Sequence, residues 1–353
     1  MAGLVNVLGL LQALDPGNSW RIDMILLLGA SGYVGRAFAG ELRRRGLCFI
    51  PLTRRAFDYT RFDFLFDYLR TMRPAFLINT ACYKGATGCL AGEGERDRMM
   101  ATNAVLPQMI ARVCMMTKTP WGHVSSGSVY CGVKLLQNGS VAIQRTLGAD
   151  SLALFAAHPE RFCGFTELDE PNASFRSPPC NFYSGTKALG EEAIRDVGRN
   201  YVWRLRLPFT DWEEPSNWLW QMLRHGEARE GINSFSHLLD CVKACLDLWE
   251  SQAPFGIYNV INPGTTTTGS VANAMQRILR APVRLHPPDP ADDEDSPPSS
   301  CVLDCGKLLR AGVKLRAVDE ALADSLDGLR RAGRTLRTFA TQSHVLPAAI
   351  PLA

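Results

Sequence analysis

The chain has 353 residues, which at about 150 residues per domain is enough for two domains or for one large α/β domain with an appended region. Hydrophobic residues make up 46% and charged residues 21% of the sequence, so the collagen-like, disordered and disulfide-scaffold classes are excluded. The 38 basic and 35 acidic side chains leave a net charge of +3, which is too small for the basic surface that nucleic acid binding needs.

Eleven cysteines are scattered along the chain without a CxxC pair. Cys241 and Cys245 are at helical spacing, which predicts small buried hydrophobes rather than metal ligands, so we predict no metal site. This number of reduced thiols indicates a cytoplasmic protein. Residues 1–23 resemble no signal peptide, and no run of about 18 apolar residues predicts a membrane span. Met24 directly precedes the first apolar run, so we treat residues 1–23 as an N-terminal extension and Met24 as a candidate translation start.

Short apolar runs alternate with helical patterns along the first part of the chain. This alternation predicts an α/β fold, a Rossmann-type doubly wound parallel sheet with right-handed crossovers. The predicted strands are Met24–Leu28, Leu47–Leu52, Ala75–Asn79, Trp121–Ser125, Tyr201–Leu207 and Gly256–Val260. A first helix follows Gly35 and ends near Arg43, and the later predicted helices are Arg61–Met72, Met99–Met116, Tyr183–Val197, Trp212–Arg224, Leu238–Trp249 and Leu315–Leu329.

The pattern divides the chain into four parts. Residues 24–207 are predicted to form a cofactor-binding domain, and residues 208–330 a smaller, mixed α/β substrate-binding region. The periodicity weakens over about 131–181, which we interpret as a long insertion that covers the active site or binds a partner. Residues 287–300, with acidic residues between prolines, are predicted to form a mobile loop, and residues 331–353 a tail.

A glycine turn joins the first predicted strand to the first helix. It reads Gly29-Ala-Ser31-Gly32-Tyr33-Val34-Gly35, with the glycines at GxxGxxG spacing. The first glycine permits a tight turn, the second lets the backbone approach a pyrophosphate, and the third lets helix and strand pack closely. Exposed N–H groups and the helix dipole favour negative phosphates at this point. We therefore predict a dinucleotide site formed by Gly29, Ser31, Gly32, Tyr33, Val34 and Gly35.

The charge after the second predicted strand indicates which dinucleotide is preferred. A protein that prefers NAD usually places a carboxylate there, where it accepts a hydrogen bond from the ribose 2′-hydroxyl. This chain has Arg54 and Arg55 instead, and guanidinium groups suit a 2′-phosphate. The sequence thus predicts a preference for NADP(H), with NAD(H) as the other cofactor it can take. Asp58 is a candidate contact for the adenine amino group.

A tyrosine and a lysine lie four residues apart in Tyr183-Ser-Gly-Thr-Lys187, and therefore on one face of a helix. A free phenol has a pKa of about 10, and a nearby ammonium group lowers that value. The strand that ends at Ser125 and Ser126 brings a hydroxyl to the carboxyl edge of the sheet, where ligands of such folds bind. Tyr183, Lys187 and Ser126 are the predicted catalytic residues.

These motifs together resemble one family, the extended short-chain dehydrogenase/reductases, over roughly residues 24–329. GASGYVG, FLINTACY, ATNAVLP, VSSGSVY and YSGTK occur in the family's order. The chain is similar to the dTDP-4-dehydrorhamnose reductase, GDP-L-fucose synthase and plant-type nucleotide-rhamnose epimerase/reductase branches, most of all to the last. The resemblance implies further cofactor contacts at Asn79, Ala81, Tyr83, Asn103, Lys187 and Pro208, and substrate contacts at Ser128, Arg206 and Asn217.

The resemblance also implies an activity, the NADPH-dependent reduction of the C4 ketone of a 4-keto-6-deoxy nucleotide sugar. Tyr183 would protonate the nascent alkoxide and Ser126 would orient the carbonyl. Lys187 would lower the pKa of the phenol and hold the nicotinamide ribose.

Two departures from the family narrow this activity. The 4,6-dehydratases carry an acidic pair after the serine strand, where this chain has Ser126-Gly127-Ser128, so dehydration is rejected. The epimerising relatives carry a cysteine in place of Ser128, and a serine hydroxyl is a poor base, so reduction alone is the expectation. Cys131 is the nearby thiol that would have to substitute for it.

Two other functions fit the same motifs. One is a nucleotide-sugar epimerase that retains NAD, and the other is a non-catalytic NADP-binding regulatory subunit. The predicted helices 99–116 and 183–197 carry apolar residues on more than one face. They are therefore either buried against the sheet or paired in a homodimer.

Overall fold

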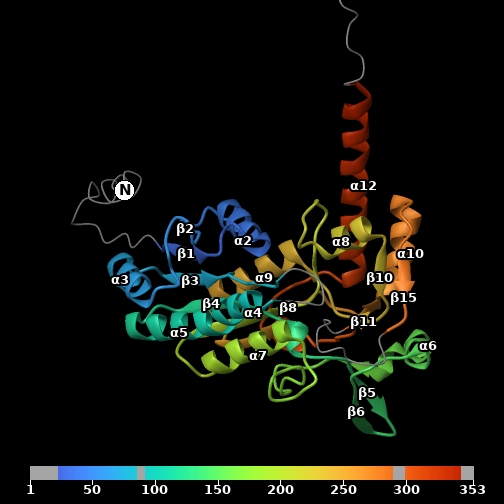
Figure 1. The fold of residues 1–353 in the computed structure, drawn as a ribbon, viewed down its shortest axis with the longest axis horizontal. Helices are drawn as coiled ribbons and strands as arrows, with labels where there is room; N and C mark the ends of the chain where they lie inside the picture. The colour runs from blue at the N-terminus through green and yellow to red at the C-terminus, as the bar shows by residue number, and fades with distance from the viewer. Residues whose placement is uncertain (1–22, 86–91, 289–298, 343–353) are drawn as a thin grey trace, which may run out of the picture.

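The computed structural model describes residues 23–85, 92–288 and 299–342 (Figure 1). Its centre is a six-stranded sheet in the order β13-β8-β4-β3-β1-β2, in which every pairing is parallel. The chain runs outward from β1 to β2 and then in the opposite direction from β3 to β13, so the winding reverses between β1 and β3. The predicted doubly wound α/β class is confirmed. The strands are β1 (Ile25–Leu28), β2 (Phe49–Leu52), β3 (Phe76–Asn79), β4 (Trp121–Ser126), β8 (Asn200–Leu205) and β13 (Gly256–Asn259).

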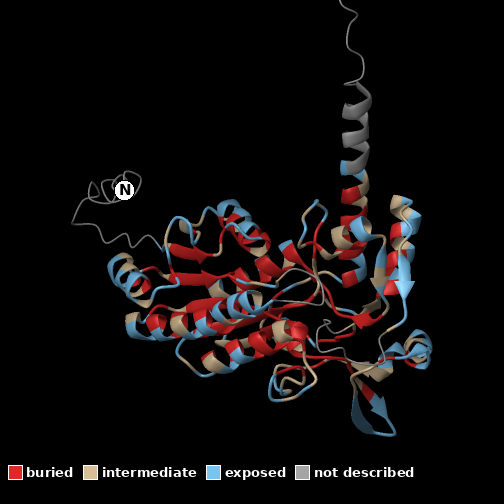
Figure 2. Ribbon diagram, in the orientation of Figure 1, coloured by how far each residue is buried: buried red, intermediate tan, exposed pale blue. Residues whose placement is uncertain are grey.

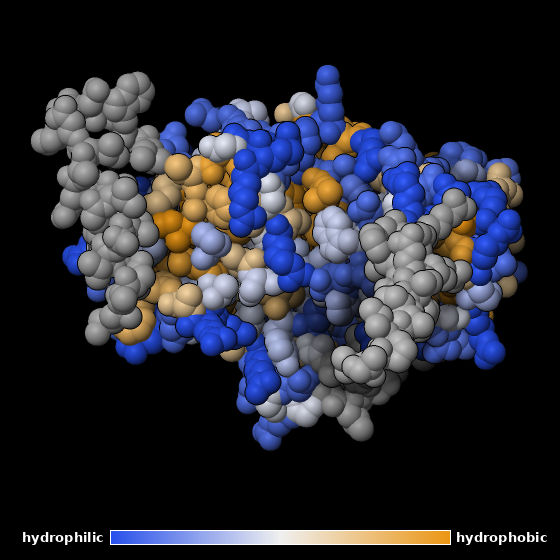
Figure 3. Space-filling view, turned by 90° about the horizontal axis from the view of Figure 1, so that it is seen from above, coloured by the Kyte–Doolittle hydropathy of each residue, from blue (hydrophilic) through white to orange (hydrophobic). Residues whose placement is uncertain are grey.

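Helices cover both faces of this sheet (Figure 1). Side chains alternate across β1, where Ile25 and Leu27 belong to one core and Leu26 and Leu28 to the other. Figure 2 shows the strands as an almost continuous buried layer. In Figure 3, hydrophobic side chains form one broader area on the left part of the upper face and smaller areas elsewhere between hydrophilic ones. One face is covered by α2 (Tyr33–Arg44) and α9 (Leu238–Glu250), and the other by α3 (Phe62–Met72), α5 (Leu106–Thr117) and α7 (Phe182–Ile194).

Several predicted boundaries differ from the structure. The helix predicted from Met99 starts earlier, because α4 (Glu93–Met100) runs through a π-helical turn, η1 (Ala101–Val105), into α5. The strand predicted to reach Leu207 ends as β8 at Leu205, since Leu207 has a left-handed φ of 40°, and β9 (Pro208–Phe209) is separate. The helix predicted from Trp212 begins later, as α8 (Trp218–His225). Its N-cap is Asn217, whose side chain accepts a hydrogen bond from the backbone nitrogen of Leu219.

The insertion is folded, although the periodicity of its sequence is weak. Its strands β5 (Val133–Gln137), β6 (Ser140–Gln144) and β7 (Phe162–Cys163) form an antiparallel sheet beside α6 (Ala149–Ala157). Asn138 and Gly139 join β5 to β6 with φ values of 48° and 79°, the left-handed pair that a tight hairpin needs. The hairpin projects away from the central sheet (Figure 1).

The second part of the chain packs three helices around short strand pairs. These helices are α8, α10 (Thr268–Leu279) and α12 (Val318–Gln342), and α12 continues past the predicted end at Leu329. Residues 1–22, most of the predicted loop 287–300 and residues 343–353 lie outside the described residues. The remaining elements are β10 (Glu227–Arg229), β11 (Ile232–Asn233), β12 (Ser236–His237), β14 (Thr266–Thr267), β15 (Arg284–His286), α11 (Gly306–Arg310) and the short 3-10 helices η2 (Gly127–Val129) and η3 (Pro159–Arg161).

Gly35 sets how closely α2 packs on the glycine turn. A Cβ at Gly35 would lie 2.2 Å from the carbonyl oxygen of Gly29, whereas a Cβ at Gly40 in the same helix would meet nothing within 4 Å. We expect Gly35→Ala to lower the free energy of unfolding by roughly 1–3 kcal/mol, the usual cost of overpacking. Gly40→Ala, the matched control, should raise it by about 0.5–1 kcal/mol. Urea unfolding measures both values, and equal changes in the two variants would contradict the packing argument.

Candidate active site

A cleft of about 1020 Å³ lies at the carboxyl ends of the central strands and is lined by residues from both parts of the chain. This is where open α/β sheets bind ligands, in the crevice where the winding reverses. Ten of the predicted site residues line the cleft: Gly32, Tyr33, Val34, Tyr83, Ser126, Ser128, Tyr183, Lys187, Arg206 and Pro208. The others lie outside its lining: Gly29, Ser31, Gly35, Arg54, Arg55, Asp58, Asn79, Ala81, Asn103 and Asn217.

The glycine turn forms a cradle at one end of the cleft. Gly29 has a φ of +75°, and a Cβ there would lie 2.7 Å from the backbone nitrogen of Ala81, two positions after the end of β3. Gly32 is the N-cap of α2 with no side-chain hydrogen bond, and the first turn of α2 carries no acidic residue. The helix therefore presents its positive end to the cleft without a carboxylate to compete for it. This donor set fits the pyrophosphate of a dinucleotide.

The residues after β2 stand apart from the cleft wall. Arg54, Arg55 and Asp58 are all exposed in the turn that follows Leu52. One carboxylate oxygen of Asp58 accepts a hydrogen bond from the backbone nitrogen of Thr60 at 3.2 Å, so Asp58 shapes this turn. The contacts of all three residues with a cofactor stay predictions.

The side-chain amides of two predicted residues, Asn79 and Asn103, bind the backbone that follows β3. Asn79 is fully buried, with its side-chain oxygen 3.1 Å from the backbone nitrogen of Ala81 and its amide nitrogen 3.1 Å from Nδ1 of His123. Asn103 accepts from the backbone nitrogen of Tyr83 at 3.0 Å and donates to the carbonyl of Tyr83 at 2.8 Å. Both side chains fix the backbone that follows β3 rather than project into the cleft.

Tyr183 and Lys187 enter the cleft from the first turns of α7. The N-cap Asn181 accepts from the backbone nitrogen of Ser184 at 2.7 Å, which fixes where this helix begins. Lys187 is 1% exposed, and its ammonium donates to the carbonyl of Val124 on β4 at 3.0 Å. Phenol, ammonium and the hydroxyl of Ser126 therefore meet at one end of β4.

The electrostatics of this group differ from the expectation. Burial raises the pKa of Tyr183 well above the ordinary value of a phenol, and the hydrogen bond with Ser126 offsets this only in part. Burial also lowers the pKa of Lys187. The predicted lowering of the phenol's pKa by Lys187 is not the net effect in this structure. A raised pKa keeps the proton on Tyr183, as a proton donor requires.

The predicted substrate residues separate into two groups. Arg206 is buried, and its guanidinium donates to the hydroxyl of Ser128 at 3.2 Å and to the side-chain oxygen of Asn233 at 2.6 Å. Arg206 and Ser128 therefore form one polar wall of the cleft. Asn217 instead caps α8 and donates to the carbonyl of Thr210 at 2.9 Å, so its side chain has a structural role here.

Sequence reasoning missed several residues of the cleft. Cys82 lines it, with its Sγ 3.7 Å from the hydroxyl of Tyr183, and its place three positions after the end of β3 was the available signal. Cys131, considered as a substitute thiol, is buried outside the lining, with its Sγ 3.6 Å from the carbonyl of Arg145. The second part of the chain adds lining residues that no motif marks, among them Trp218, His225, Arg229, Asn233 and Ser299.

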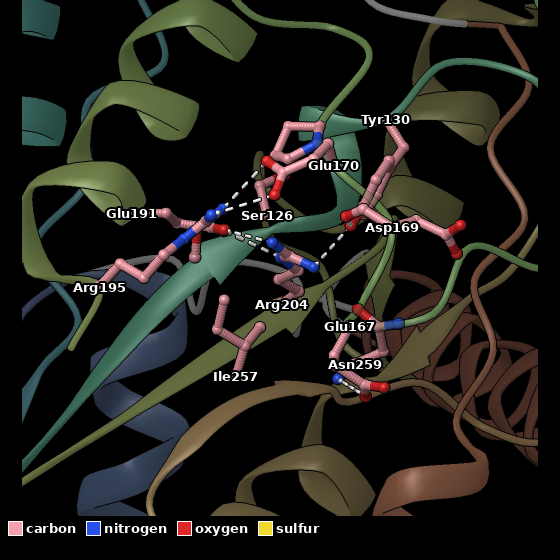
Figure 4. A network of polar contacts seen from close by, with 12 residues as sticks. Ser126, Tyr130, Glu167, Asp169, Glu170, Glu191, Arg195, Arg204, Ile257 and Asn259 are labelled. Carbon is pink, nitrogen blue, oxygen red and sulfur yellow. Dashed lines mark hydrogen bonds and ion pairs between the residues drawn. The ribbon is translucent and has the colours of Figure 1, made fainter.

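A buried ion pair holds α7 against the sheet (Figure 4). The guanidinium of Arg204 on β8 donates to a carboxylate oxygen of Glu191 on α7 at 2.6 Å, and the two side chains are 1% and 2% exposed. Ser125 on β4 donates to the same carboxylate, and Arg204 also donates to the hydroxyl of Tyr130 at 2.9 Å. Glu191 lies one turn beyond Lys187, so this network fixes the helix that carries the predicted catalytic pair.

A doubly wound sheet with a glycine turn and a Tyr-Lys helix over one cleft is the arrangement of the extended short-chain dehydrogenase/reductases. Within this class, the profile of the RmlD substrate binding domain matches residues 23–331, and the chain belongs to this family.

Two relatives show how the chain compares in sequence. It is 26% identical to the dTDP-4-dehydrorhamnose reductase of Streptomyces griseus, over 88% of this chain and 95% of that protein. It is 23% identical to a trifunctional UDP-glucose 4,6-dehydratase/UDP-4-keto-6-deoxy-D-glucose 3,5-epimerase/UDP-4-keto-L-rhamnose-reductase of Arabidopsis thaliana, over 70% of this chain. The chain spans only 33% of that plant protein's length.

Two solved structures show the same fold. A dTDP-4-dehydrorhamnose reductase of Bacillus anthracis in complex with NADP aligns with a TM-score of 0.64 and 18% identity, over 88% of this chain and 99% of that chain. A UDP-rhamnose synthase of Acanthamoeba polyphaga mimivirus aligns with a TM-score of 0.68 and 15% identity, over 86% of this chain and 99% of that chain. At these identities the likeness concerns the fold alone.

We expect Glu191→Gln and Glu192→Gln to change the free energy of unfolding by very different amounts, because only Glu191 belongs to the buried ion pair. Glu191→Gln leaves the charge of Arg204 buried without its carboxylate, so the free energy of unfolding should fall by about 3–5 kcal/mol. Glu192 is 42% exposed and pairs with Arg176 at the surface, so Glu192→Gln should change it by less than about 0.5 kcal/mol. Urea unfolding of both variants makes the measurement. A Glu191→Gln variant as stable as the unchanged protein would contradict the role given to this pair.

Proposed function

We propose that the protein is an NADPH-dependent reductase of the C4 ketone of a 4-keto-6-deoxy nucleotide sugar. The observation that carries this proposal is the meeting of Tyr183, Lys187 and Ser126 in the same cleft as the turn at Gly32. The names of the relatives support the same activity, because those of Streptomyces griseus and Mycolicibacterium smegmatis are dTDP-4-dehydrorhamnose reductases.

The roles of the side chains follow from their geometry. NADPH, when bound, supplies the hydride that the ketone carbon receives. Ser126 is placed to donate a hydrogen bond to the ketone oxygen, and Tyr183, whose raised pKa retains its proton, protonates the oxygen as negative charge develops on it. Lys187 is held against Val124 by its ammonium and supplies a nearby positive charge that stabilises the phenolate left behind.

The exposed guanidinium groups of Arg54 and Arg55 support a preference for NADP(H). They stand in the turn after β2, where the ribose 2′ position of a dinucleotide lies in this fold. NAD(H) is the alternative cofactor, and related folds take either one. The Bacillus anthracis reductase was solved with NADP, and the UDP-glucose 4-epimerase of Thermus thermophilus was solved with NAD.

The sugar nucleotide is assigned to the far end of the cleft. Arg206 and Ser128 form its polar wall, and the region from residue 208 to residue 330 supplies much of the remaining lining. The segment Ser126-Gly127-Ser128 contains no acidic residue, and Cys131 lies outside the cleft lining. Reduction without dehydration, and without thiol-assisted epimerisation at this position, is therefore the proposed reaction.

We assign a cytoplasmic location from the thiols. The ten cysteines within the described residues are all free, which suits a reducing compartment. None of the helices described here is both long and apolar enough to cross a membrane.

A homodimer formed through η1, α5 and α7 is part of the proposal. Val105, Met116 and Leu189 on these helices are 53%, 52% and 38% exposed, which leaves apolar surface open beside the sheet. We expect Leu189→Arg to shift the protein from dimer to monomer in sedimentation velocity. Leu309→Arg, a change at a similarly exposed leucine on α11, should leave the dimer intact. A monomeric unchanged protein would refute the dimer.

The activity is tested with a panel of UDP-, dTDP- and GDP-linked 4-keto-6-deoxy sugars and NADPH. The unchanged protein should oxidise NADPH with at least one of them. Tyr183→Phe removes the proton donor and leaves the glycine turn intact. It should therefore keep its NADPH affinity by fluorescence titration and lose roughly 10²–10⁴-fold in turnover, the usual contribution of an acid–base group.

Tyr68→Phe is the control, because Tyr68 lies on α3 away from the cleft, and its turnover should be unchanged. Full turnover by Tyr183→Phe would remove Tyr183 from the acid's role. NADPH binding without turnover on any member of the panel would instead favour a regulatory subunit.

A further inference from the structure

A thiol lies beside the hydroxyl of the proposed proton donor. Cys82 follows β3 with only two residues between, and its Sγ is 3.7 Å from the hydroxyl oxygen of Tyr183, within hydrogen-bonding reach for sulfur. Cys82 is exposed and lines the cleft, whereas Tyr183 is half-buried. The thiol therefore connects the phenol to the open part of the cleft.

The thiol lies within electrostatic reach of the buried ammonium of Lys187. Burial lowers the pKa of Lys187, the charges of Cys82 and Glu191 raise it, and that of Lys84 lowers it. The thiol, the phenol of Tyr183 and this ammonium therefore occupy one small region of the cleft.

The reaction creates a need for such a group. Once Tyr183 has protonated the substrate it is a phenolate, and the next turnover requires a new proton. Lys187 is 1% exposed with its ammonium bound to the carbonyl of Val124, so it is poorly placed to take protons directly from water. The raised pKa of Tyr183 makes its phenolate a strong base, which favours transfer of a proton to it from a donor in hydrogen-bonding contact.

We propose that Cys82 is the relay residue that returns a proton to Tyr183 after each reduction, an inference that rests on the proposed function. The S–H bond of Cys82 breaks as the O–H bond of Tyr183 forms. The thiolate then takes a proton from water at the exposed side of the cleft. No electrons are exchanged, and the net proton comes from solvent. Cys82 acts through Tyr183 and needs no contact with the substrate.

The first test is kinetic. Cys82→Ala should lower kcat by at least about tenfold with little change in KM, a smaller loss than the roughly 10²–10⁴-fold expected of the group that protonates substrate directly. Added imidazole buffer, a small proton donor, should restore turnover of Cys82→Ala in proportion to its concentration. A merely structural role would not respond to it. Cys48→Ala, at an exposed cysteine outside the cleft lining, is the matched control and should behave like the unchanged protein.

The second test needs no turnover. In protein carrying ¹³Cζ-labelled tyrosine, the Tyr183 resonance is assigned by its loss in Tyr183→Phe. Cys82→Ala should then shift the pKa of Tyr183 downward, because both the charge of Cys82 and its hydrogen bond raise that pKa. Cys48→Ala should leave it unchanged.

The outcomes separate the relay from the function on which it rests. Turnover by the unchanged protein together with an unaffected kcat in Cys82→Ala overturns the relay alone. A loss of kcat that imidazole does not restore also overturns it. Absence of turnover by the unchanged protein overturns the proposed function and the relay with it.

Discussion

The attachment of α7 to the sheet is the constraint on which the candidate site depends. Tyr183 and Lys187 can act with Ser126 only if their helix holds a fixed register against β4. The carboxylate of Glu191 provides that register, because it accepts hydrogen bonds from Arg204 on β8 and from Ser125 on β4. A buried pair of this kind adds little net stability compared with apolar packing, but removing one partner is costly. The main effect of the pair is therefore to fix the position of α7 on the sheet.

Glycines provide the matching constraint on the cofactor side of the cleft. Gly29 packs against the backbone of Ala81, and Gly35 against the backbone of Gly29, so closely that neither position has room for a Cβ atom. On α7, Gly190 lies where a Cβ would be 2.2 Å from the carbonyl oxygen of Asn103. These contacts let the helices approach the sheet and one another closely enough to bring both halves of the site to one cleft. Residue size, rather than hydrogen bonding, is the limiting quantity at these points.

Local patterns made much of this arrangement predictable. The turn from Gly29 to Gly35 and the pair Tyr183 and Lys187 are each contained within a few residues, so spacing alone placed them on a turn and on one helix face. The alternating β/α pattern predicted the six parallel strands, although not where β8 would end. The hairpin at Asn138 and Gly139 carried a local signal as well, but the irregular sequence around it obscured the strands on either side.

Long-range contacts could not be predicted in the same way. Cys82 and Tyr183 are 101 positions apart, and nothing in either segment indicates that the two side chains meet. Asn79 and Asn103 fall within motifs but turn inward to bind backbone, a choice that depends on which donors the fold leaves for them. The direction of the Tyr183 pKa likewise depends on burial in the folded state.

That direction bears on how the site can work. A phenol whose pKa is raised holds its proton firmly until negative charge develops on a neighbouring oxygen, which suits it to protonate an alkoxide and not to abstract protons at rest. The same property makes the phenolate a strong base once formed, so it is readily reprotonated by any more acidic group within reach. Cys82 lies within reach of the Tyr183 hydroxyl, and it is the more exposed of the two side chains. In the proposed relay, the more exposed Cys82 therefore takes the proton from solvent, and the more buried Tyr183 passes it to the substrate.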